Sequence, residues 1–486
     1  MKIKIRKFFA SFNSKGRMGL DLVEPGEGIE QQQVNKELPP EVDSGLLYRD
    51  VVRIAWPSLV ELTLTQLASM VDLMMVGSLG PWAITAVGLT MQPKFLMMTM
   101  FLAMNVGATA LVARYKGQDS PRKANIVLNQ AMLLTFILSV IASFIGFIFA
   151  ESMISFMGAA DAETLAGGTI YLKIQMVGLV ILALTSTITA TLRGIGNSRT
   201  AMRYNLIGNG VNVVFNYLLI YGHFGFPEMG VAGASLATVI GQGVAFILGL
   251  MVILRGDQYL HLRFREGFKP QWNYLKSIFN IGVPAMIEQL VMRTGIIIYS
   301  KTVASLGTLA FATHQICMNI QALSFMNGQA FAVSATSLMG QSLGKKRLDM
   351  AQAYSSRTRR IGMMVSIILG LIFFFLGTPI MNLYTDDPEI IAQGIRILKL
   401  VALIQPFQSS QFILAGALRG AGDTRATAVI TFMTVLLLRP GLAKLSINVL
   451  GWGLIGAWIA LVADQLVRSL LVVLRYKSEK WKNIKI

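Results

Sequence analysis

The sequence is poor in the residues that form metal centres, redox sites and disulfides. Its 486 residues include one cysteine, Cys317, and three histidines, His223, His261 and His314. A single cysteine excludes an intrachain disulfide, and neither an HExxH nor a CxxC spacing occurs. We therefore predict no resident metal, no cofactor and no catalytic constellation, and the protein is not expected to be an enzyme.

Charged residues are also scarce. They make up 14% of the chain, whereas 54% of the residues are hydrophobic, and the mean hydropathy is +0.58. A soluble chain of this length would carry more charge on its surface. Apolar runs long enough to cross a bilayer recur along the chain, for example at 131–150 and 361–380. A transmembrane barrel would show short alternating segments instead, so we predict an all-α polytopic membrane protein.

Twelve segments are predicted to cross the membrane as helices, with boundary errors of a few residues. They are 50–78, 84–113, 122–150, 165–191, 199–222, 231–255, 275–304, 309–340, 350–376, 390–417, 425–449 and 453–475.

The formal net charge of +18 is informative through its placement. Lysine and arginine occur in alternate connections, such as 114–123 and 345–347, and in the tail from Arg475 onward, whereas connections such as 222–230 and 385–389 contain neither. By the positive-inside rule, both termini are predicted to be cytoplasmic. Contact with anionic membrane lipids follows from this placement, and nucleic acid is not an expected partner.

The two halves of the chain repeat each other. Residues 54–118 align with 281–345 at a constant offset of 227 without a gap, which pairs Pro57 with Pro284 and Glu61 with Glu288. Each half holds six predicted helices. Because six is even, both halves enter from the same face, and an axis along the membrane normal relates them. The predicted fold class is therefore twelve transmembrane helices in two pseudo-symmetric six-helix bundles.

This repeat predicts the domain organisation. Residues 1–47 are expected to form a disordered cytoplasmic tail and 48–255 an N-terminal lobe with helices 1–6. A cytoplasmic linker (256–274) leads to a C-terminal lobe (275–476) with helices 7–12, and 477–486 form a basic cytoplasmic tail.

A turn with nearly the same sequence also occurs in both halves: LRGIGNSRT at 192–200 and LRGAGDTRA at 418–426. Arg193 and Arg419 are expected at helix C-termini, where a cation is favourable for the helix dipole. Asn197 and Asp423 are suited to cap the helices that follow. We expect a helix-reversal turn, with a hinge as an alternative role, rather than a direct contact with a substrate.

The paired LRGxG[ND]xR turns, VDLMMVGSLG (71–80), NxxxNYLLIYG (212–222) and GVAGASLAT (230–238) together resemble the multidrug and toxic compound extrusion (MATE) family, bacterial type. The resemblance covers roughly residues 48–476. It implies a secondary antiporter that exports organic, often cationic, compounds in exchange for sodium ions or protons. It also implies two six-helix bundles around a V-shaped central cleft.

We therefore predict a multidrug efflux antiporter in the bacterial plasma (inner) membrane. It would export amphipathic organic cations by alternating access and function as a monomer. A lipid-intermediate flippase of the wider superfamily and a passive channel are the alternatives. The sequence leaves the substrate open and does not decide between H⁺ and Na⁺ coupling, although its sparse carboxylates favour protons.

Charged side chains in predicted spans are costly and point to functional or structural networks. In the first span, Glu61 and Asp72 are eleven residues apart and share a helix face. Asp72 matches the family's first-helix aspartate, which the resemblance implicates in cation or proton handling. Lys94 in the second span is either a structural counter-ion for these carboxylates or a group that a cationic substrate displaces.

The fifth span carries Asn209, Asn212 and Asn216, of which the last two share a face. Some family members carry Asp at the position of Asn216, so this chain lacks one proton acceptor of those members. The alternative role for these asparagines is hydrogen bonding between helices.

The second half contains Glu288, Arg293, Arg439, Asp464 and Arg468. Asp464 and Arg468 are four apart and are expected to pair, whereas Glu288 and Arg293 need partners on other helices. Sodium-coupled relatives use acids in their seventh and tenth helices. Glu288 is a loose match to the first, and the tenth-helix stretch IQPFQSSQ contains no acid. The alternative interpretation is a buried charge network that orders this lobe.

The candidates fall into two ranks. The first-rank candidates for ion coupling and substrate binding are Asp72, Glu61, Glu288 and Asp464. The second-rank candidates are Lys94, Asn209, Asn212, Asn216, Arg293 and Arg439. A transported sodium ion is the one metal expected at these positions.

Overall fold

The computed structural model describes residues 43–159, 161–256, 259–262 and 269–484. Most of the predicted tail 1–47, part of the predicted linker and the last two residues lie outside this range. Each regular element in the described part of the chain is helical.

The long helices of the first half are α2 (Ser44–Gly77), α3 (Pro81–Gly117), α4 (Pro121–Ile148), α6 (Ala162–Gly194), α7 (Ser198–Tyr221) and α8 (Gly230–Leu254). Those of the second half are α9 (Trp272–Ala304), α10 (Thr308–Gly344), α11 (Leu348–Phe375), α13 (Pro388–Gly420), the composite segment Thr424–Val449 and α16 (Gly453–Lys477). The short elements are α5 (Ala150–Phe156), η1 (His223–Gly225), α12 (Gly377–Asn382) and η5 (Lys480–Asn483).

Each predicted span coincides with one of these long segments. Ten of them, among the described residues, are long and apolar enough to cross a membrane. The more polar α7 and α10 fall outside these ten although they have 24 and 37 residues. The chain is therefore an all-helical multi-span membrane protein with about 10 to 12 membrane helices, as predicted. α2 begins at Ser44 rather than at residue 50.

The eleventh span differs from the expected single α-helix. It consists of α14 (Thr424–Thr431), the π-helix η3 (Phe432–Leu438), α15 (Arg439–Lys444) and the π-helix η4 (Leu445–Val449). π-Helical segments are rare and occur frequently at functional sites. Here α15 begins with Arg439, one of the predicted second-rank residues.

Local sequence explains where several helices begin. Proline occupies the first turn of α3, α4 and α13, where its missing N–H costs no hydrogen bond. The side chains of Asp43, Asp161 and Asp387 accept backbone N–H groups at the starts of α2, α6 and α13. Gly80 and Gly307 precede α3 and α10 with φ of 121° and 101°, values that favour glycine.

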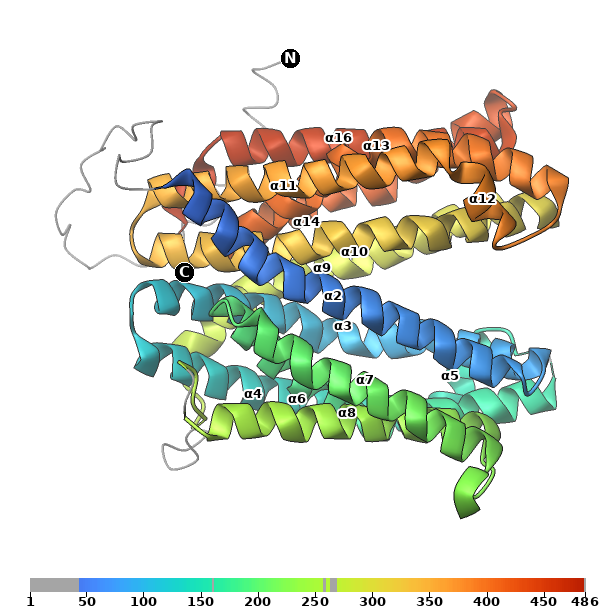
Figure 1. Ribbon diagram of the computed structural model, residues 1–486, viewed down its shortest axis with the longest axis horizontal. Coiled ribbons are helices and arrows are strands. Elements are labelled where there is room, and N and C mark those ends of the chain that lie inside the picture. Colours follow the sequence, from blue (N-terminus) through green and yellow to red (C-terminus); the bar gives the residue numbers. More distant parts are fainter. Residues whose placement is uncertain (1–42, 160, 257–258, 263–268, 485–486) are drawn as a thin grey trace. The chain divides into compact units, whose positions relative to one another are not determined.

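The helix packing repeats between the halves. In the first half α3, α4 and α6 pack together, α7 packs on α8, and α2 lies along α7 (Figure 1). In the second half α10, α11 and α13 form the equivalent group, and α9 packs on α14. The short helices α5 and α12 occupy equivalent positions as well, at Ala150–Phe156 and Gly377–Asn382. The structure thus confirms the internal duplication.

The two halves contact each other mainly through α2 and α3 of the first and α9 and α10 of the second. Close approaches occur at the end of the bundle where α3 and α10 finish: a Cβ on Gly117 would meet the carbonyl oxygen of Gln341, and one on Gly344 would meet that of Arg114. Ser334 Oγ also donates to the Val51 carbonyl at 3.1 Å.

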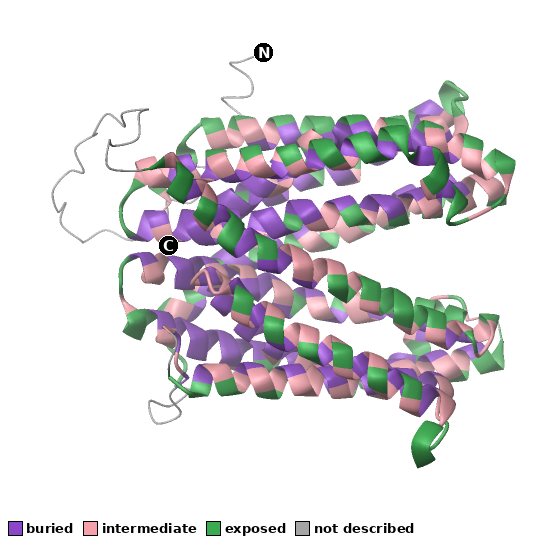
Figure 2. Cartoon of the chain, viewed as in Figure 1, coloured by how far each residue is buried: buried purple, intermediate pink, exposed green. Residues whose placement is uncertain are grey.

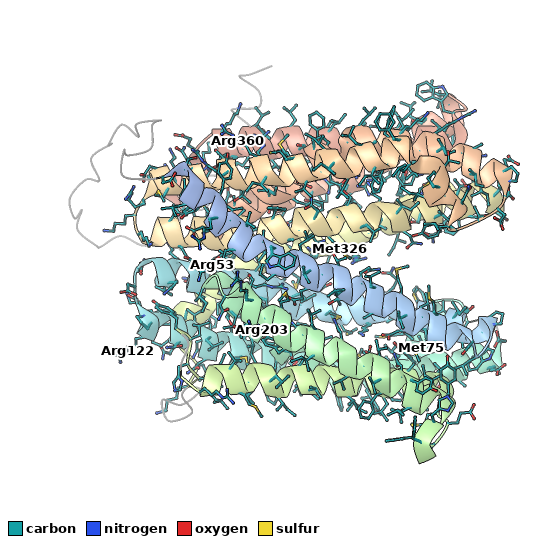
Figure 3. All side chains as sticks on the ribbon, viewed as in Figure 1. Arg53, Met75, Arg122, Arg203, Met326 and Arg360 are labelled. Carbon is teal, nitrogen blue, oxygen red and sulfur yellow. The ribbon has the colours of Figure 1, made fainter. Side chains whose placement is uncertain are left out.

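We call this end the basic end, because the alternate connections that reach it carry the lysines and arginines. Arg53, Arg122 and Arg203 lie toward it in Figure 3, whereas Met75 lies toward the other end. Figure 2 shows that burial follows the same direction in α2, whose buried residues are concentrated between Leu47 and Glu61. Beyond Glu61 most side chains of α2 are exposed or half-buried.

The last residues form an unexpected contact. The Trp481 side chain is 1% exposed and its ring stacks on Tyr476 with centroids 5.4 Å apart. Arg114 Nη1 donates to the Ile484 carbonyl at 3.4 Å. The described part of the predicted basic tail therefore packs onto the helices rather than extending from them.

Candidate functional site

A row of polar contacts joins α2 to α7. Asn205 donates to Glu61 at 2.6 Å, Asn209 donates to Thr65 Oγ1 at 2.8 Å, and Asn216 donates to Asp72 at 2.5 Å. The partners in each contact are 144 positions apart. A constant separation means that the two helices run parallel, so the polar row follows their seam from the basic end toward the opposite end.

Asp72 lies at the far part of this row and is surrounded by amides. The Asn212 amide satisfies its neighbours when its nitrogen faces Asp72: it then donates to both carboxylate oxygens at 3.1 and 3.0 Å, and its oxygen accepts the Thr238 backbone N–H at 3.1 Å. Asn216, which also donates to Asp72, is fully buried. Asn212 and Asn216, which the sequence places on one face of their helix, thus both face Asp72.

Lys94 and Asp72 attract each other electrostatically but are not in direct contact. Its Nζ donates to Gln175 Oε1 at 2.6 Å, and the Gln175 amide nitrogen donates to Ser235 Oγ at 3.0 Å. The ion pairs of the described residues include none between Lys94 and Asp72 or Glu61. Lys94 is therefore held by a neutral amide on α6.

Glu61 and Glu288 form equivalent ion pairs in the two halves. Arg193 contacts Glu61 at 2.8 Å, and Arg419 contacts Glu288 at 2.6 Å. Thr427 also donates to Glu288 at 2.9 Å. Both carboxylates are at least nine-tenths buried. Each first helix of a half is thereby tied to the repeated LRGxG turn.

The remaining first-rank residue, Asp464, is fully buried between two arginines. Arg439 donates to its Oδ2 through Nη2 at 2.5 Å and through Nε at 3.0 Å. Arg468 donates to the same oxygen at 3.2 Å, which is the predicted i,i+4 pair. Arg439 also lies 5.7 Å from the centre of the Tyr299 ring. One carboxylate therefore serves two guanidinium groups.

Arg293 has a different environment. Its guanidinium carbon lies 3.4 Å from the centre of the Phe95 ring, which belongs to α3 of the other half. The described residues provide no carboxylate partner for it. The expectation that its partner lies on another helix is confirmed, and that partner is an aromatic ring rather than an acid.

The repeated turns differ in how they cap the next helix. The Asn197 side chain accepts the Thr200 N–H at 3.3 Å and caps α7 as predicted. Asp423 occupies the equivalent position before α14, but its side chain makes no capping bond. It pairs with Arg475 of α16 at 2.7 Å instead. The predicted cap at Asp423 is wrong because a charged partner from the last helix competes for the carboxylate.

Several residues of these networks were not singled out from the sequence. They are Asn205, Gln175 and Thr427, and Arg193 and Arg419 in their role as carboxylate partners. The repeat contained a signal for the arginines, because Glu61 and Glu288 recur together with Arg193 and Arg419 in the two halves. The neutral residues carry no comparable signal in a single sequence.

The MatE family model matches the chain twice, over residues 57–218 and 284–445. The two matches are 227 positions apart, which is the offset of the internal repeat. The chain belongs to the MATE family. This confirms the resemblance seen in the sequence, and the family is one of transporters rather than enzymes.

Curated relatives match over most of their length. The chain is 29% identical to the probable multidrug resistance protein NorM of Thermotoga maritima, over 92% of this chain and 95% of the relative. It is 26% identical to the uncharacterized transporter YisQ of Bacillus subtilis, over 88% and 94%. It is thus a multi-pass membrane protein of the MATE family with bacterial relatives that include multidrug-resistance proteins.

Solved structures show the same fold at lower identity. An outward-facing multidrug resistance MATE transporter of the MOP superfamily matches with a TM-score of 0.82 at 22% identity, over 89% of this chain and 97% of that chain. A MOP superfamily transporter from Pyrococcus furiosus, for which reversed polarity of the binding pocket suggests a different function, matches with a TM-score of 0.83 at 22% identity, over 90% and 97%.

Proposed function

We propose that this MATE transporter is a secondary antiporter that exports amphipathic organic compounds, organic cations among them, in exchange for an inward-moving cation. The proposal places it in the bacterial plasma membrane with both termini cytoplasmic, so that the basic end faces the cytoplasm. A probable multidrug resistance protein that matches 92% of this chain supports the export of organic compounds.

The observation that carries the proposal is the contrast between Asp72 and the other three embedded carboxylates. Glu61, Glu288 and Asp464 each have an arginine partner, whereas Asp72 has amide partners and no ion pair among the described residues. A carboxylate that is attracted by Lys94 but directly contacts no cation among the described residues is able to take up and release a mobile cation. We therefore assign Asp72 the central role in coupling.

The amides around Asp72 suit this role chemically. Asn212 and Asn216 donate hydrogen bonds that hold the carboxylate in place without adding a positive charge beside it. The side-chain oxygen of the fully buried Asn216 accepts no hydrogen bond among the described residues. Oxygen atoms of this kind suit Na⁺ as well as a hydrated proton. We propose proton coupling first, because one carboxylate is a sparse ligand set for Na⁺.

Glu61 and Glu288 have a related role in this proposal. Their ion pairs with Arg193 and Arg419 hold the first helix of each half against its LRGxG turn near the basic end. Protonation of either carboxylate would weaken its pair and free that helix to move. Because a ligand shifts a two-state equilibrium only by its differential affinity, such pairs would give the coupling ion a preference between the two access states.

Transport into proteoliposomes tests the function. A proton gradient and a sodium gradient are imposed separately while accumulation of ethidium is followed by fluorescence. We expect one gradient to drive accumulation above the equilibrium distribution. Equilibration of ethidium without any gradient dependence would indicate a passive channel and contradict antiport. Movement of a labelled lipid without transport of ethidium would favour a flippase.

A further inference from the structure

Arg293 is a charged side chain in a membrane-spanning helix whose charge has no counterpart. It belongs to α9, is half-buried, and has no carboxylate partner among the described residues. A charged arginine within a membrane-spanning helix is energetically costly, so its presence there points to a function. The ring of Phe95 on α3 covers one face of the guanidinium, with 3.4 Å between Cζ and the ring centre.

The membrane-embedded charges of the C-terminal lobe are positive in sum. Asp464 shares its one negative charge between Arg439 and Arg468, and Glu288 is paired with Arg419. The C-terminal lobe therefore places more guanidinium groups than carboxylates in its interior. A negatively charged group on an exported compound is attracted by this excess of positive charge.

The helix face around Arg293 is otherwise apolar. Leu290 and Ile297 lie three residues before and four residues after it, so they share its face of α9. Their side chains are 36% and 54% exposed. A compound that places an anionic group on the guanidinium would therefore lay its apolar body along these two side chains and Phe95.

Guanidinium chemistry defines the ligand class. Five N–H groups in a planar fork match the two oxygens of a carboxylate, sulfonate or phosphate. Phe95 covers the flat face of the guanidinium, and no described residue accepts a hydrogen bond from its N–H groups. We propose that Arg293 binds an anionic group of the transported compound, so that this transporter accepts zwitterionic or anionic amphiphiles. This inference rests on the proposed export of amphipathic compounds.

A matched pair of dyes tests the proposal. Rhodamine B carries a free carboxylate, and its ethyl ester differs only in masking that charge. Binding of each to the purified protein in nanodiscs of neutral lipid is measured by fluorescence anisotropy for wild type, Arg293→Gln and Arg293→Lys. We expect Arg293→Gln to weaken binding of the acid about tenfold or more while the ester changes little. Arg293→Lys should restore part of the difference, because it keeps the charge and loses the fork.

Lys301→Gln on the same helix is the matched control, because Lys301 is exposed and lies in the last turn of α9. It should leave both dyes unaffected. Equal losses for acid and ester in Arg293→Gln would mean a structural role and overturn the proposal. The proposal would also be overturned if wild type binds rhodamine B no more tightly than Arg293→Gln does. If wild type binds rhodamine B through Arg293 but no ion gradient drives transport, the antiport function is contradicted and the Arg293 proposal is not.

An anionic lipid headgroup offers the same chemistry from another source. Nanodiscs that contain phosphatidylglycerol separate the two. If this lipid competes with rhodamine B in wild type and the competition disappears in Arg293→Gln at unchanged dye affinity, Arg293 serves a lipid and the proposal fails. If the dye affinity of wild type is the same with and without the anionic lipid, the substrate assignment stands.

Discussion

Individual residues in this protein are divided between fixed and mobile electrostatic partners. Asp464 contacts two arginines and is fully buried, whereas Asp72 contacts only amides among the described residues. A buried carboxylate that neutralises two guanidinium groups is difficult to remove. A carboxylate held by amides remains available for an exchangeable cation. Aspartate therefore stabilises the fold at position 464 and is proposed to bind the coupling ion at position 72.

This division predicts that Asp464→Asn is destabilising. The substitution leaves Arg439 and Arg468 buried without their charge partner, which costs about 3–5 kcal/mol for a broken buried pair. Thermal unfolding in detergent should show a clear loss of stability. Asp386→Asn, a change at an exposed loop position, should unfold like wild type. Wild-type stability combined with lost transport would instead identify Asp464 as a coupling residue.

The sequence predicted candidate residues within the membrane but not their interaction partners. Membrane-embedded charge, the internal repeat and the family resemblance together singled out Asp72, Glu61, Glu288 and Asp464 as candidates, because charged groups are costly in a bilayer. Charge alone did not predict which of them has a fixed partner. Arg193 follows Glu61 by 132 positions, and Asn205 is one polar residue among several on its helix. Partners at such separations are set by helix packing, which the pattern of a single helix does not contain.

At the scale of elements, helix boundaries followed closely from hydropathy, proline and glycine. The composite eleventh span did not, because π-helical turns in Phe432–Leu438 and Leu445–Val449 leave the apolar pattern unchanged. The sequence also did not predict the contacts between α3 and α10. They depend on Gly117 and Gly344, whose missing side chains let the helix backbones approach at the basic end.

Gly344→Ala should therefore separate the two halves at the basic end. A methyl group there overlaps the carbonyl oxygen of Arg114 in the other half, so this packing becomes unfavourable. Ser337 is fully buried and donates to the Gly194 carbonyl of the first half at 2.9 Å. A cysteine placed at Ser337 should react faster with a maleimide when Gly344→Ala is also present.

The natural Cys317 is fully buried and gives a low background in this measurement. Gly243→Ala is the control, because a Cβ at Gly243 meets nothing within 4 Å. If the cysteine at Ser337 reacts at the same rate alone, with Gly344→Ala and with Gly243→Ala, the close contact of Gly117 and Gly344 does not hold the basic end closed.

At the scale of the whole molecule, duplication provides two lobes with related networks and different chemistry. Glu61–Arg193 and Glu288–Arg419 are equivalent in the two halves. The amide-bound Asp72 belongs to the first half only, and the unpaired Arg293 belongs to the second. We infer that the N-terminal lobe handles the coupling cation and that the C-terminal lobe recognises the exported compound.

The most direct test of this account is transport by Asp72→Asn in proteoliposomes under the gradient that drives wild type. The account predicts that the gradient no longer drives accumulation of ethidium, while ethidium still binds with an affinity within about threefold of wild type, because the removed carboxylate serves the ion. Gradient-driven accumulation at the wild-type rate would contradict the assignment of Asp72 as the coupling carboxylate.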